Sequence, residues 1–306
     1  MSGRSTCSEA ALGVTQQTGV TDMTESRRPQ QEQQPPGETA RMRPEPDDEM
    51  RAYRGSGLLA GKRALVTGGD SGIGRAVAIG FAKEGADVAI AYLSEDDDAD
   101  HTRKLVEKQG RRCTTIAGDM ADPQHCEHVV DTAVRELGGL DVLVNNIATQ
   151  QPVDKLEDIT PEQWHRAFDV NIHSFFYVTA AALPHMESGA SIVNTGSVNG
   201  LRGNASLIDY SATKGAVHVW TYSMAQALLD RGIRVNCVAP GPVWTPLIPA
   251  TFPAEKVEKF GTQAPAGREA QPDEIAPSYI FFASNRFSSY YTGEVLAPVG
   301  GEIVRG

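Results

Sequence analysis

Ser197, Tyr210 and Lys214 are the residues whose types and spacing could do chemistry. Tyr210 and Lys214 form a Tyr-x-x-x-Lys pair, which on a helix places a phenol and an ammonium on one face, about 5–6 Å apart between Cβ atoms. A phenol with a pKa of about 10 is a weak base at neutral pH, but a fixed cation beside it favours the phenolate. The pair therefore predicts a proton-transfer site, although the same pattern also arises on helix surfaces without a catalytic role.

A glycine-rich turn far upstream gives this pair a context. Residues 64–66 form a short apolar run that stops at Thr67 and Gly68, and apolar residues then recur at helical spacing from Ile73 until Gly85. A second apolar run follows at 88–93. The order of these elements predicts a β-α-β unit.

Gly68, Gly72 and Gly74 have a mechanical role in such a unit. They leave out side chains where the backbone must turn tightly, approach a pyrophosphate and pack helix against strand, and the freed N–H groups bind phosphate at the helix N-terminus. The spacing is Gly-x-x-x-Gly-x-Gly rather than Gly-x-Gly-x-x-Gly, and a purely structural turn is the alternative. The presence of Tyr210 and Lys214 downstream favours a dinucleotide site.

Residues 57–306 resemble the short-chain dehydrogenase/reductase family of the Tyr-x-x-x-Lys type. The resemblance rests on TGGDSGIG (67–74), GDMAD (118–122), NN (145–146), VNIHSFF (170–176), IVNTGSVNG (192–200), YSATK (210–214), RVNCVAPGPVWTPL (234–247) and GREAQPDEIA (267–276). The segment YRGSGLLAGK, after a Pro/Gln-rich arm, is similar to a bacterial subgroup described as general-stress or glucose/ribitol-dehydrogenase-like oxidoreductases. The resemblance implies a Rossmann-type fold and an NAD(P)-dependent oxidoreductase acting on CH–OH groups.

The resemblance assigns roles to four residues. It implies that Tyr210 is the general acid/base and that Lys214 holds the cofactor ribose hydroxyls and lowers the pKa of Tyr210. Ser197 would donate a hydrogen bond to the reacting oxygen, where a preformed donor is strongest as charge develops. Asn171 matches a family asparagine that helps to order a water chain behind the lysine. A helix asparagine that satisfies nearby backbone is the alternative for Asn171.

The resemblance also implies a set of cofactor contacts. They are Gly68, Asp70, Ser71, Gly72, Ile73, Gly74, Tyr92, Leu93, Asp119, Met120, Asn145, Ile147, Tyr210, Lys214, Pro240, Gly241, Val243 and Thr245. Asp119 and Met120 match the adenine contact, and Asn145 matches the structural asparagine after the fourth strand. The family's usual NNAG is NNIA in this chain, which alters the residues beside the cofactor but not the chemistry.

In the family, the choice between NAD and NADP depends on the residues at two sequence positions. An acid at the end of the second strand binds the NAD ribose, whereas an arginine there, or a base before the second motif glycine, pairs with the NADP phosphate. Tyr92, Leu93 and Ser71 occupy these places, so neither signature is present. The acidic run 94–100 most simply begins a helix, but it lies where the adenosine ribose is expected. With no base nearby, the run favours NAD, and NADP is the alternative.

The elements after the first β-α-β unit continue to alternate. We expect strands at 113–117, 141–145, 191–195, 234–239 and 295–299, helices at 97–109, 123–137, 161–185, 209–230 and 272–284, and a helix-rich excursion at 246–260. Near-continuous apolar strands that alternate with helices predict a single α/β domain, a doubly wound parallel sheet with helices on both faces. Ligands bind at the carboxyl ends of such strands, where the expected site residues fall.

Residues 1–55 differ from the rest in composition. They are rich in Pro, Gln and charged residues, and among Val, Ile, Leu, Phe, Trp and Tyr the first 54 contain only Leu12, Val14, Val20 and Tyr53. Such a segment cannot bury enough apolar surface to offset its ordering entropy. We therefore expect a flexible arm at 1–55, lying along the domain or a neighbouring subunit near Tyr53, ahead of a domain at 56–306. Met23 is an alternative start of the chain.

Charge and composition limit the partners. The chain of 306 residues has a formal charge of −11, which argues against nucleic acid. The arm has no apolar stretch long enough for a signal peptide or a membrane span, so we expect a cytoplasmic protein without a membrane partner. The four cysteines have neither pairing nor metal-ligand spacing, so we expect reduced thiols and no metal. By resemblance, helices that begin near residues 161 and 209 would form a homodimer or homotetramer.

The expected substrate is a small alcohol, aldehyde, ketone or sugar. A dinucleotide-binding sensor or scaffold without catalysis is one alternative, and the presence of Asn171, Ser197, Tyr210 and Lys214 speaks against it. A lyase or epimerase on the same fold is the other. Trp244 and Phe252 suggest a partly apolar lid over the pocket, although either could simply pack under it.

Overall fold

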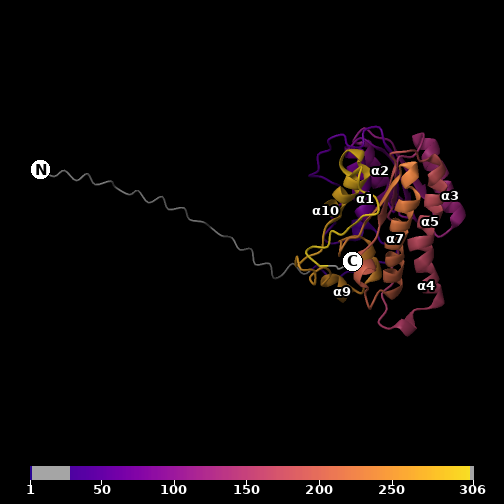
Figure 1. The fold of residues 1–306 in the computed structure, drawn as a ribbon. Helices are drawn as coiled ribbons and strands as arrows, with labels where there is room; N and C mark the ends of the chain where they lie inside the picture. Colours follow the sequence, from indigo (N-terminus) through magenta and orange to yellow (C-terminus); the bar gives the residue numbers. More distant parts are fainter. Residues whose placement is uncertain (2–27, 304–306) are drawn as a thin grey trace.

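The fold is built on one parallel sheet. The computed structural model describes Met1 and residues 28–303 (Figure 1). Seven strands pair in the order β3-β2-β1-β4-β5-β6-β7, and all pairs are parallel. The order reverses between β1 and β4, which is where doubly wound sheets bind ligands. The predicted fold class is confirmed.

The strands are short; the five inner ones are almost wholly buried, and the two at the edges of the sheet are partly exposed. The seven are β1 (Arg63–Thr67), β2 (Asp87–Tyr92), β3 (Cys113–Ala117), β4 (Val142–Asn145), β5 (Ser191–Thr195), β6 (Arg234–Val238) and β7 (Val295–Leu296). Leu65 and Val66 of β1 contribute to different core clusters because successive side chains of a strand point to opposite faces. A sheet with apolar side chains on both faces must be covered on both.

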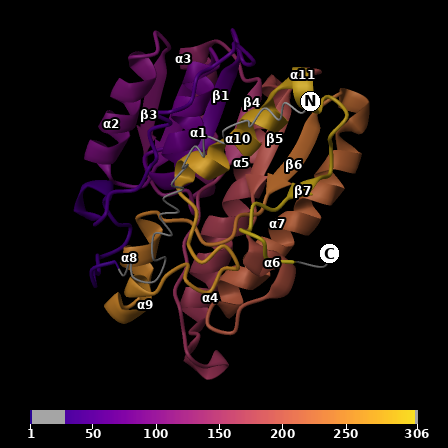
Figure 2. The same cartoon turned by 90° about the vertical axis from the view of Figure 1, so that its left-hand side faces the viewer.

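Helices supply that cover on both faces (Figure 2). One layer consists of α1 (Gly72–Lys83), α2 (Asp96–Glu107) and α10 (Pro272–Ala283), and the other of α3 (Pro123–Leu137), α4 (Pro161–Phe168), α5 (Ser174–Ala182) and α7 (Ile208–Ala227). Both layers bury their apolar side against the sheet, so the core is split into two clusters. None of the helices in the described part of the chain has the length and apolar character that a membrane span needs.

Several elements differ from the expected ones. The helix expected at 161–185 is interrupted by a π-helical segment, Asp169–His173, between α4 and α5, and it ends in the 3₁₀ turn Leu183–His185. A short helix, α6 (Val198–Arg202), follows β5 and was not expected. The excursion at 246–260 forms α8 (Leu247–Thr251) and α9 (Ala254–Glu258), and α11 (Asn285–Ser288) follows α10. The π-helical segment, α6, α8 and α9 lie at the carboxyl edge of the sheet, whereas α11 lies at the amino edge, where Asn285 Oδ1 accepts from Arg234 of β6 at 2.8 Å (Figure 2).

The described part of the expected arm is packed on the domain. Residues 28–54 run along the surface, and Met42 and Met50 are fully buried. The Trp244 indole N–H donates to the Pro44 carbonyl at 2.9 Å, so Trp244 is buried beneath the arm and does not act as a lid. The expectation that the arm has no core residues is therefore wrong for this part, because two methionines and polar anchors replace a continuous apolar run. Residues 2–27, which the same expectation covers, lie outside the described residues.

Replacing Met50 with Ala should reduce the free energy of unfolding by about 2–5 kcal/mol, as expected for truncating a buried methionine. Urea unfolding followed by circular dichroism measures this. Arg51→Ala is the matched control, because Arg51 is exposed and its pair with Glu49 is a surface pair of small value. Equal stabilities of the Met50→Ala variant and the parent would contradict a structural arm.

Candidate active site

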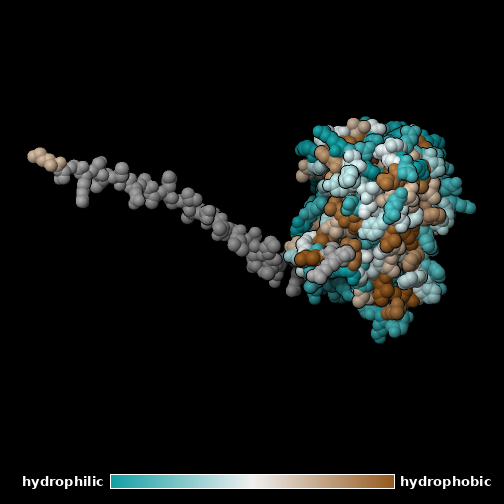
Figure 3. Space-filling view, viewed as in Figure 1, coloured by the Kyte–Doolittle hydropathy of each residue, from teal (hydrophilic) through white to brown (hydrophobic). Residues whose placement is uncertain are grey.

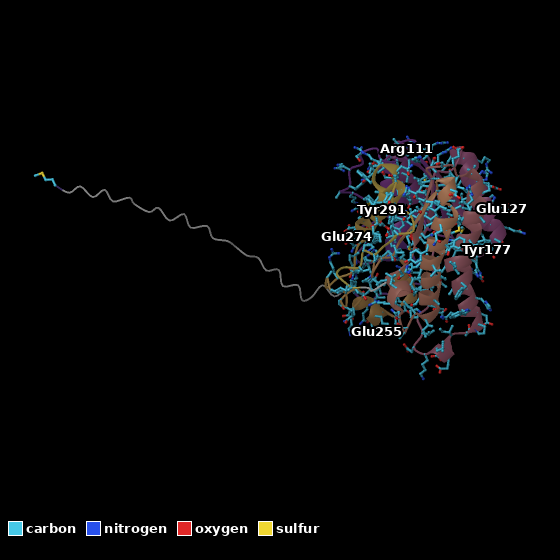
Figure 4. The ribbon with its side chains drawn as sticks, viewed as in Figure 1. Arg111, Glu127, Tyr177, Glu255, Glu274 and Tyr291 are labelled. Atoms are coloured by element: carbon cyan, nitrogen blue, oxygen red, sulfur yellow. The ribbon has the colours of Figure 1, made fainter. Side chains whose placement is uncertain are left out.

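Two adjoining cavities lie at the carboxyl edge of the sheet. Their volumes are about 370 and 270 Å³, and they share the wall residues Ile73, Thr195, Tyr210, Thr245 and Leu247. Figure 4 labels Arg111, which precedes β3, and Glu255 of α9 at opposite ends of the molecule, and the cavities lie toward the end marked by Glu255. The two cavities can hold two ligands in contact with each other.

The glycine-rich turn forms one wall of the larger cavity. Gly68 and Gly72 have φ values of +64° and +51°, which residues with a side chain rarely adopt. A Cβ on Gly74 would lie 1.8 Å from the Gly68 carbonyl oxygen, so α1 approaches β1 more closely than any other residue would permit. The turn leads into the N-terminus of the 12-residue α1. These residues fit the phosphates of a dinucleotide.

Lys214 is fixed at the base of the larger cavity. It is fully buried on α7, and its Nζ donates to the Thr195 carbonyl at 2.7 Å. Burial lowers the pKa of Lys214 to about 8, so that the ammonium is still charged at neutral pH. Its Nζ lies 5.6 Å from the centroid of the Tyr210 ring.

Tyr210 separates the two cavities. Burial raises the pKa of Tyr210 to about 12, and a hydrogen bond with Ser197 opposes this rise. Burial thus acts against the lowered pKa that the resemblance implied, and it is the largest influence on this phenol. At neutral pH the hydroxyl carries its proton, which suits a proton donor.

Ser197 lines only the smaller cavity. It caps the N-terminus of α6, where its Oγ accepts a hydrogen bond from the Asn199 backbone N–H at 3.1 Å. The hydroxyl proton is thereby left for another acceptor. Ser197 and Tyr210 thus present two O–H groups to the same space.

Asn171 lies in the π-helical segment between α4 and α5. Its Nδ2 donates to the Thr149 carbonyl at 2.8 Å and to the Thr213 hydroxyl at 3.1 Å, and its Oδ1 accepts from the Thr149 N–H at 2.7 Å. Asn171 therefore holds the loop after β4 against α7. Its contact on α7 is Thr213, the residue before Lys214. Single-turn π-bulges are common at functional sites.

Most of the expected cofactor contacts line the cavities. The larger cavity is lined by Gly68, Asp70, Ser71, Gly72, Ile73, Tyr92, Leu93, Asp119, Ile147, Tyr210, Lys214 and Thr245, and the smaller by Pro240, Gly241 and Val243. Gly74 lies behind the turn, where it permits the close packing described above.

Two expected contacts lie elsewhere. Asn145 is fully buried, and its Nδ2 donates to the Thr179 hydroxyl at 3.1 Å and to Asn194 Oδ1 at 3.0 Å. Met120 packs in the core cluster beneath α3. Neither lines a cavity, because both side chains point into the layer between the sheet and the helices rather than out of its edge.

Two cavity residues were not among the expected cofactor contacts. Asn146 donates from Nδ2 to the carbonyls of Thr67 and Gly68, at 3.1 and 3.2 Å, and so holds the glycine-rich turn. The Asn-Asn pair was its only signal. Arg166 of α4 also lines the larger cavity and pairs with Asp119 at 2.7 Å, which nothing in the sequence pattern indicated.

The comparisons with known proteins agree with this geometry. The family model described as enoyl-(acyl carrier protein) reductase matches residues 68–301. This chain belongs to the short-chain dehydrogenase/reductase family. It is therefore an NAD(P)-dependent oxidoreductase acting on CH–OH groups.

Two relatives fit the predicted subgroup. The chain is 52% identical over 269 residues to general stress protein 39 of Bacillus subtilis, covering 88% of this chain and 94% of the relative. It is 47% identical over 284 residues to glucose and ribitol dehydrogenase of Daucus carota, covering 91% and 97%. The latter match is longer than the stretch from 57 to 306, so it extends into the arm.

Solved structures confirm the fold and the class of cofactor. A short-chain dehydrogenase from Burkholderia cenocepacia in complex with NADP is 34% identical, with a TM-score of 0.75, and covers 80% of this chain and 98% of that one. An NADH-dependent reductase complexed with NAD is 29% identical, with a TM-score of 0.72, and covers 81% and 98%. A nicotinamide dinucleotide is the cofactor that these likenesses support.

Replacing Tyr210 with Phe removes the hydroxyl at the junction of the cavities and keeps the ring. We expect turnover to fall by at least about 10²-fold, with dinucleotide binding largely retained. Steady-state kinetics and a binding titration separate the two effects. Tyr290→Phe is the control, because Tyr290 is exposed and lines neither cavity. Turnover within a few-fold of the parent would exclude Tyr210 as the proton donor.

Proposed function

We propose that the protein interconverts a small alcohol and the corresponding carbonyl compound, with Tyr210 as the general acid/base. The observation that carries the proposal is the position of Tyr210 between a cavity with a phosphate-binding turn and a second, separate cavity. When bound, the nicotinamide ring supplies or accepts the hydride. The second cavity is then the place for the substrate.

The residues around the reacting oxygen have distinct tasks. In reduction, the Tyr210 phenol donates its proton to the carbonyl oxygen as negative charge develops there. The Ser197 hydroxyl donates a second hydrogen bond to the same oxygen. The Lys214 ammonium then stabilises the phenolate left on Tyr210, since an opposite charge nearby favours the ionised form. Oxidation of the alcohol reverses these steps.

The lining of the smaller cavity favours a small polyhydroxylated substrate. Its polar residues include Gln150, Asn199, Arg202, Asn204, Gln263 and Glu302, and its apolar ones include Phe252 and Phe260. Asn199 Oδ1 is buried, and among the described residues it has no hydrogen-bond partner. A buried acceptor left unpaired is costly, so a substrate hydroxyl that donates to it would be favoured. A sugar, a polyol or a short hydroxyaldehyde meets this requirement.

The experiment that tests the function is a screen of polyols, sugars, short aldehydes and diketones with NAD(H) and NADP(H), followed at the nicotinamide absorbance band. We expect an absorbance change with at least one hydroxylated substrate. Conversion without an absorbance change would indicate a lyase or epimerase. Tight dinucleotide binding without any conversion would indicate a sensor.

We propose further that NAD is preferred to NADP. Glu95 lines the larger cavity near Leu93, and the Tyr92 hydroxyl donates to Asp96 Oδ1 at 2.6 Å. The bases in this region are already engaged: Arg75 is 2% exposed and binds Asp48 and Asp98, Lys104 pairs with Asp100, and Arg166, which lines the cavity, pairs with Asp119. Among the described residues, a 2′-phosphate at this end would meet carboxylates without a free base.

Titration of the parent protein with both dinucleotides should show NAD binding more tightly, by about tenfold for each 1.4 kcal/mol of repulsion. Leu93→Arg should narrow or reverse this gap, because a guanidinium would pair with the phosphate. Leu93→Met is the control that fills the same space without charge. Tighter binding of NADP to the parent would contradict the proposal.

We also propose that the protein forms a homodimer or homotetramer through α4, α5 and α7. Apolar side chains gather on this face (Figure 3), and Trp164, Phe176, Val219 and Tyr222 are exposed there. Large apolar patches commonly mark interfaces. Sedimentation at micromolar concentration should show an oligomer, and Phe176→Glu should shift it toward the monomer. A parent protein that sediments as a monomer would refute the proposal.

The cysteines Cys113, Cys126 and Cys237 are free thiols, which fits the cytoplasm.

A further inference from the structure

The packed arm reaches the cofactor cavity itself. Pro35, Pro36 and Gly37 line the larger cavity together with the glycine-rich turn. None of the three belongs to a family motif or contacts the reacting groups. They bring an apolar surface to a cavity whose other walls come from the domain.

The segment is anchored on both sides of the cavity. Before the turn, the Gln33 N–H donates to the Pro249 carbonyl of α8 at 2.7 Å. After it, the Thr39 N–H donates to Asp98 Oδ2 of α2 at 2.9 Å. Both α8 and the loop that leads into α2 contribute lining residues, so residues 33–39 cross from one wall to the other.

The turn is braced within itself. Gln33 Oε1 accepts from the Glu38 N–H at 2.7 Å, and Gln33 Nε2 donates to the Glu38 carbonyl at 3.2 Å. Gly37 has a φ of +87°, and a Cβ there would lie 2.7 Å from the Pro246 carbonyl oxygen and 2.9 Å from the Ala250 Cβ. The turn is thus held closed and seated against α8.

The second anchor belongs to the same network as the glycine-rich turn. Asp98 binds the buried Arg75 at 2.6 Å, and Arg75 also binds Asp48 of the arm at 3.2 Å. The Arg75 Nε–H donates to the Asp70 carbonyl, at 2.9 Å, and Asp70 lines the cavity. A change at the phosphate-binding turn and a change in the arm are therefore mechanically connected.

We propose that residues 33–39 form an outer wall of the dinucleotide site and retain the bound cofactor. The inference rests on the cofactor occupying the larger cavity, as in the proposed function. A ligand beneath a wall anchored at both ends can leave only when the wall moves aside or through the opening that remains. The wall should therefore change mainly the dissociation rate of the cofactor.

Two variants test this with stopped-flow fluorescence of bound NADH, or of NADPH if that binds more tightly. Deletion of residues 1–37 removes the part of the wall that lines the cavity but keeps the buried Met42, Asp48 and Met50. Gly37→Ala keeps the chain length and displaces the turn. We expect both variants to raise the dissociation rate by roughly tenfold. Differences in affinity between related complexes lie mostly in this rate.

Gly57→Ala is the matched control. Gly57 also has a positive φ, +82°, but a Cβ there would meet nothing within 4 Å, and Gly57 lines neither cavity. Its dissociation rate should equal that of the parent. Thermal unfolding of the ligand-free variants shows whether each is folded.

Hydrogen exchange on the parent protein provides a readout that needs no variant. Saturating dinucleotide should slow exchange of the Glu38 and Thr39 amides, because a ligand retained by the wall also stabilises it. Unchanged exchange, or unchanged dissociation rates in both folded variants, would overturn the proposal. If the parent binds no dinucleotide at all, the cofactor assignment fails instead.

Discussion

The buried guanidinium of Arg75 connects the parts of this molecule that form the dinucleotide site. It belongs to α1, directly after the glycine-rich turn, and it binds carboxylates of the arm and of α2. A charge this deeply buried is tolerated only with partners, and removing one of them typically costs about 3–5 kcal/mol. The requirement to neutralise Arg75 therefore fixes the arm, α1 and α2 relative to one another. It also removes from the ribose end of the cavity a base that would otherwise be available to a phosphate.

The side chains of the active site are likewise held in place by groups of the protein. Lys214 is held by the Thr195 carbonyl, so its position is set by β5 and not by the ligand. Tyr210 keeps its proton because partial burial raises the pKa of the phenol, while Ser197 is oriented by the start of α6. Each group is fixed by a different element at the carboxyl edge of the sheet, which is how a rigid fold can hold a reactive geometry that no single element contains.

The sequence predicts the sheet well because its strands are continuous apolar runs and its turns are marked by glycine. The strands at 113–117 and 191–195 and the helix at 123–137 have the bounds observed. The arm could not be predicted, since Met42 and Met50 are isolated apolar residues whose partners lie far away in the chain. The π-helical segment was also missed, because one extra residue in a turn leaves the apolar pattern of the helix almost unchanged. Likewise, no pattern indicates that burial would dominate the pKa of Tyr210.

The arm joins segments that are distant in the chain. The Met50 N–H donates to Asp273 Oδ1 at 2.9 Å, and the Asp273 N–H donates to the Asp47 carbonyl at 3.0 Å. On the ribosome, residues 28–50 are made long before residues 244–273, which supply part of their binding surface. The arm can therefore complete its docking only after nearly the whole sheet has been synthesised, and contacts of such long range form slowly. Docking of the arm would then be a late event in folding, and until it occurs the side of Trp244 that the arm covers is exposed to water.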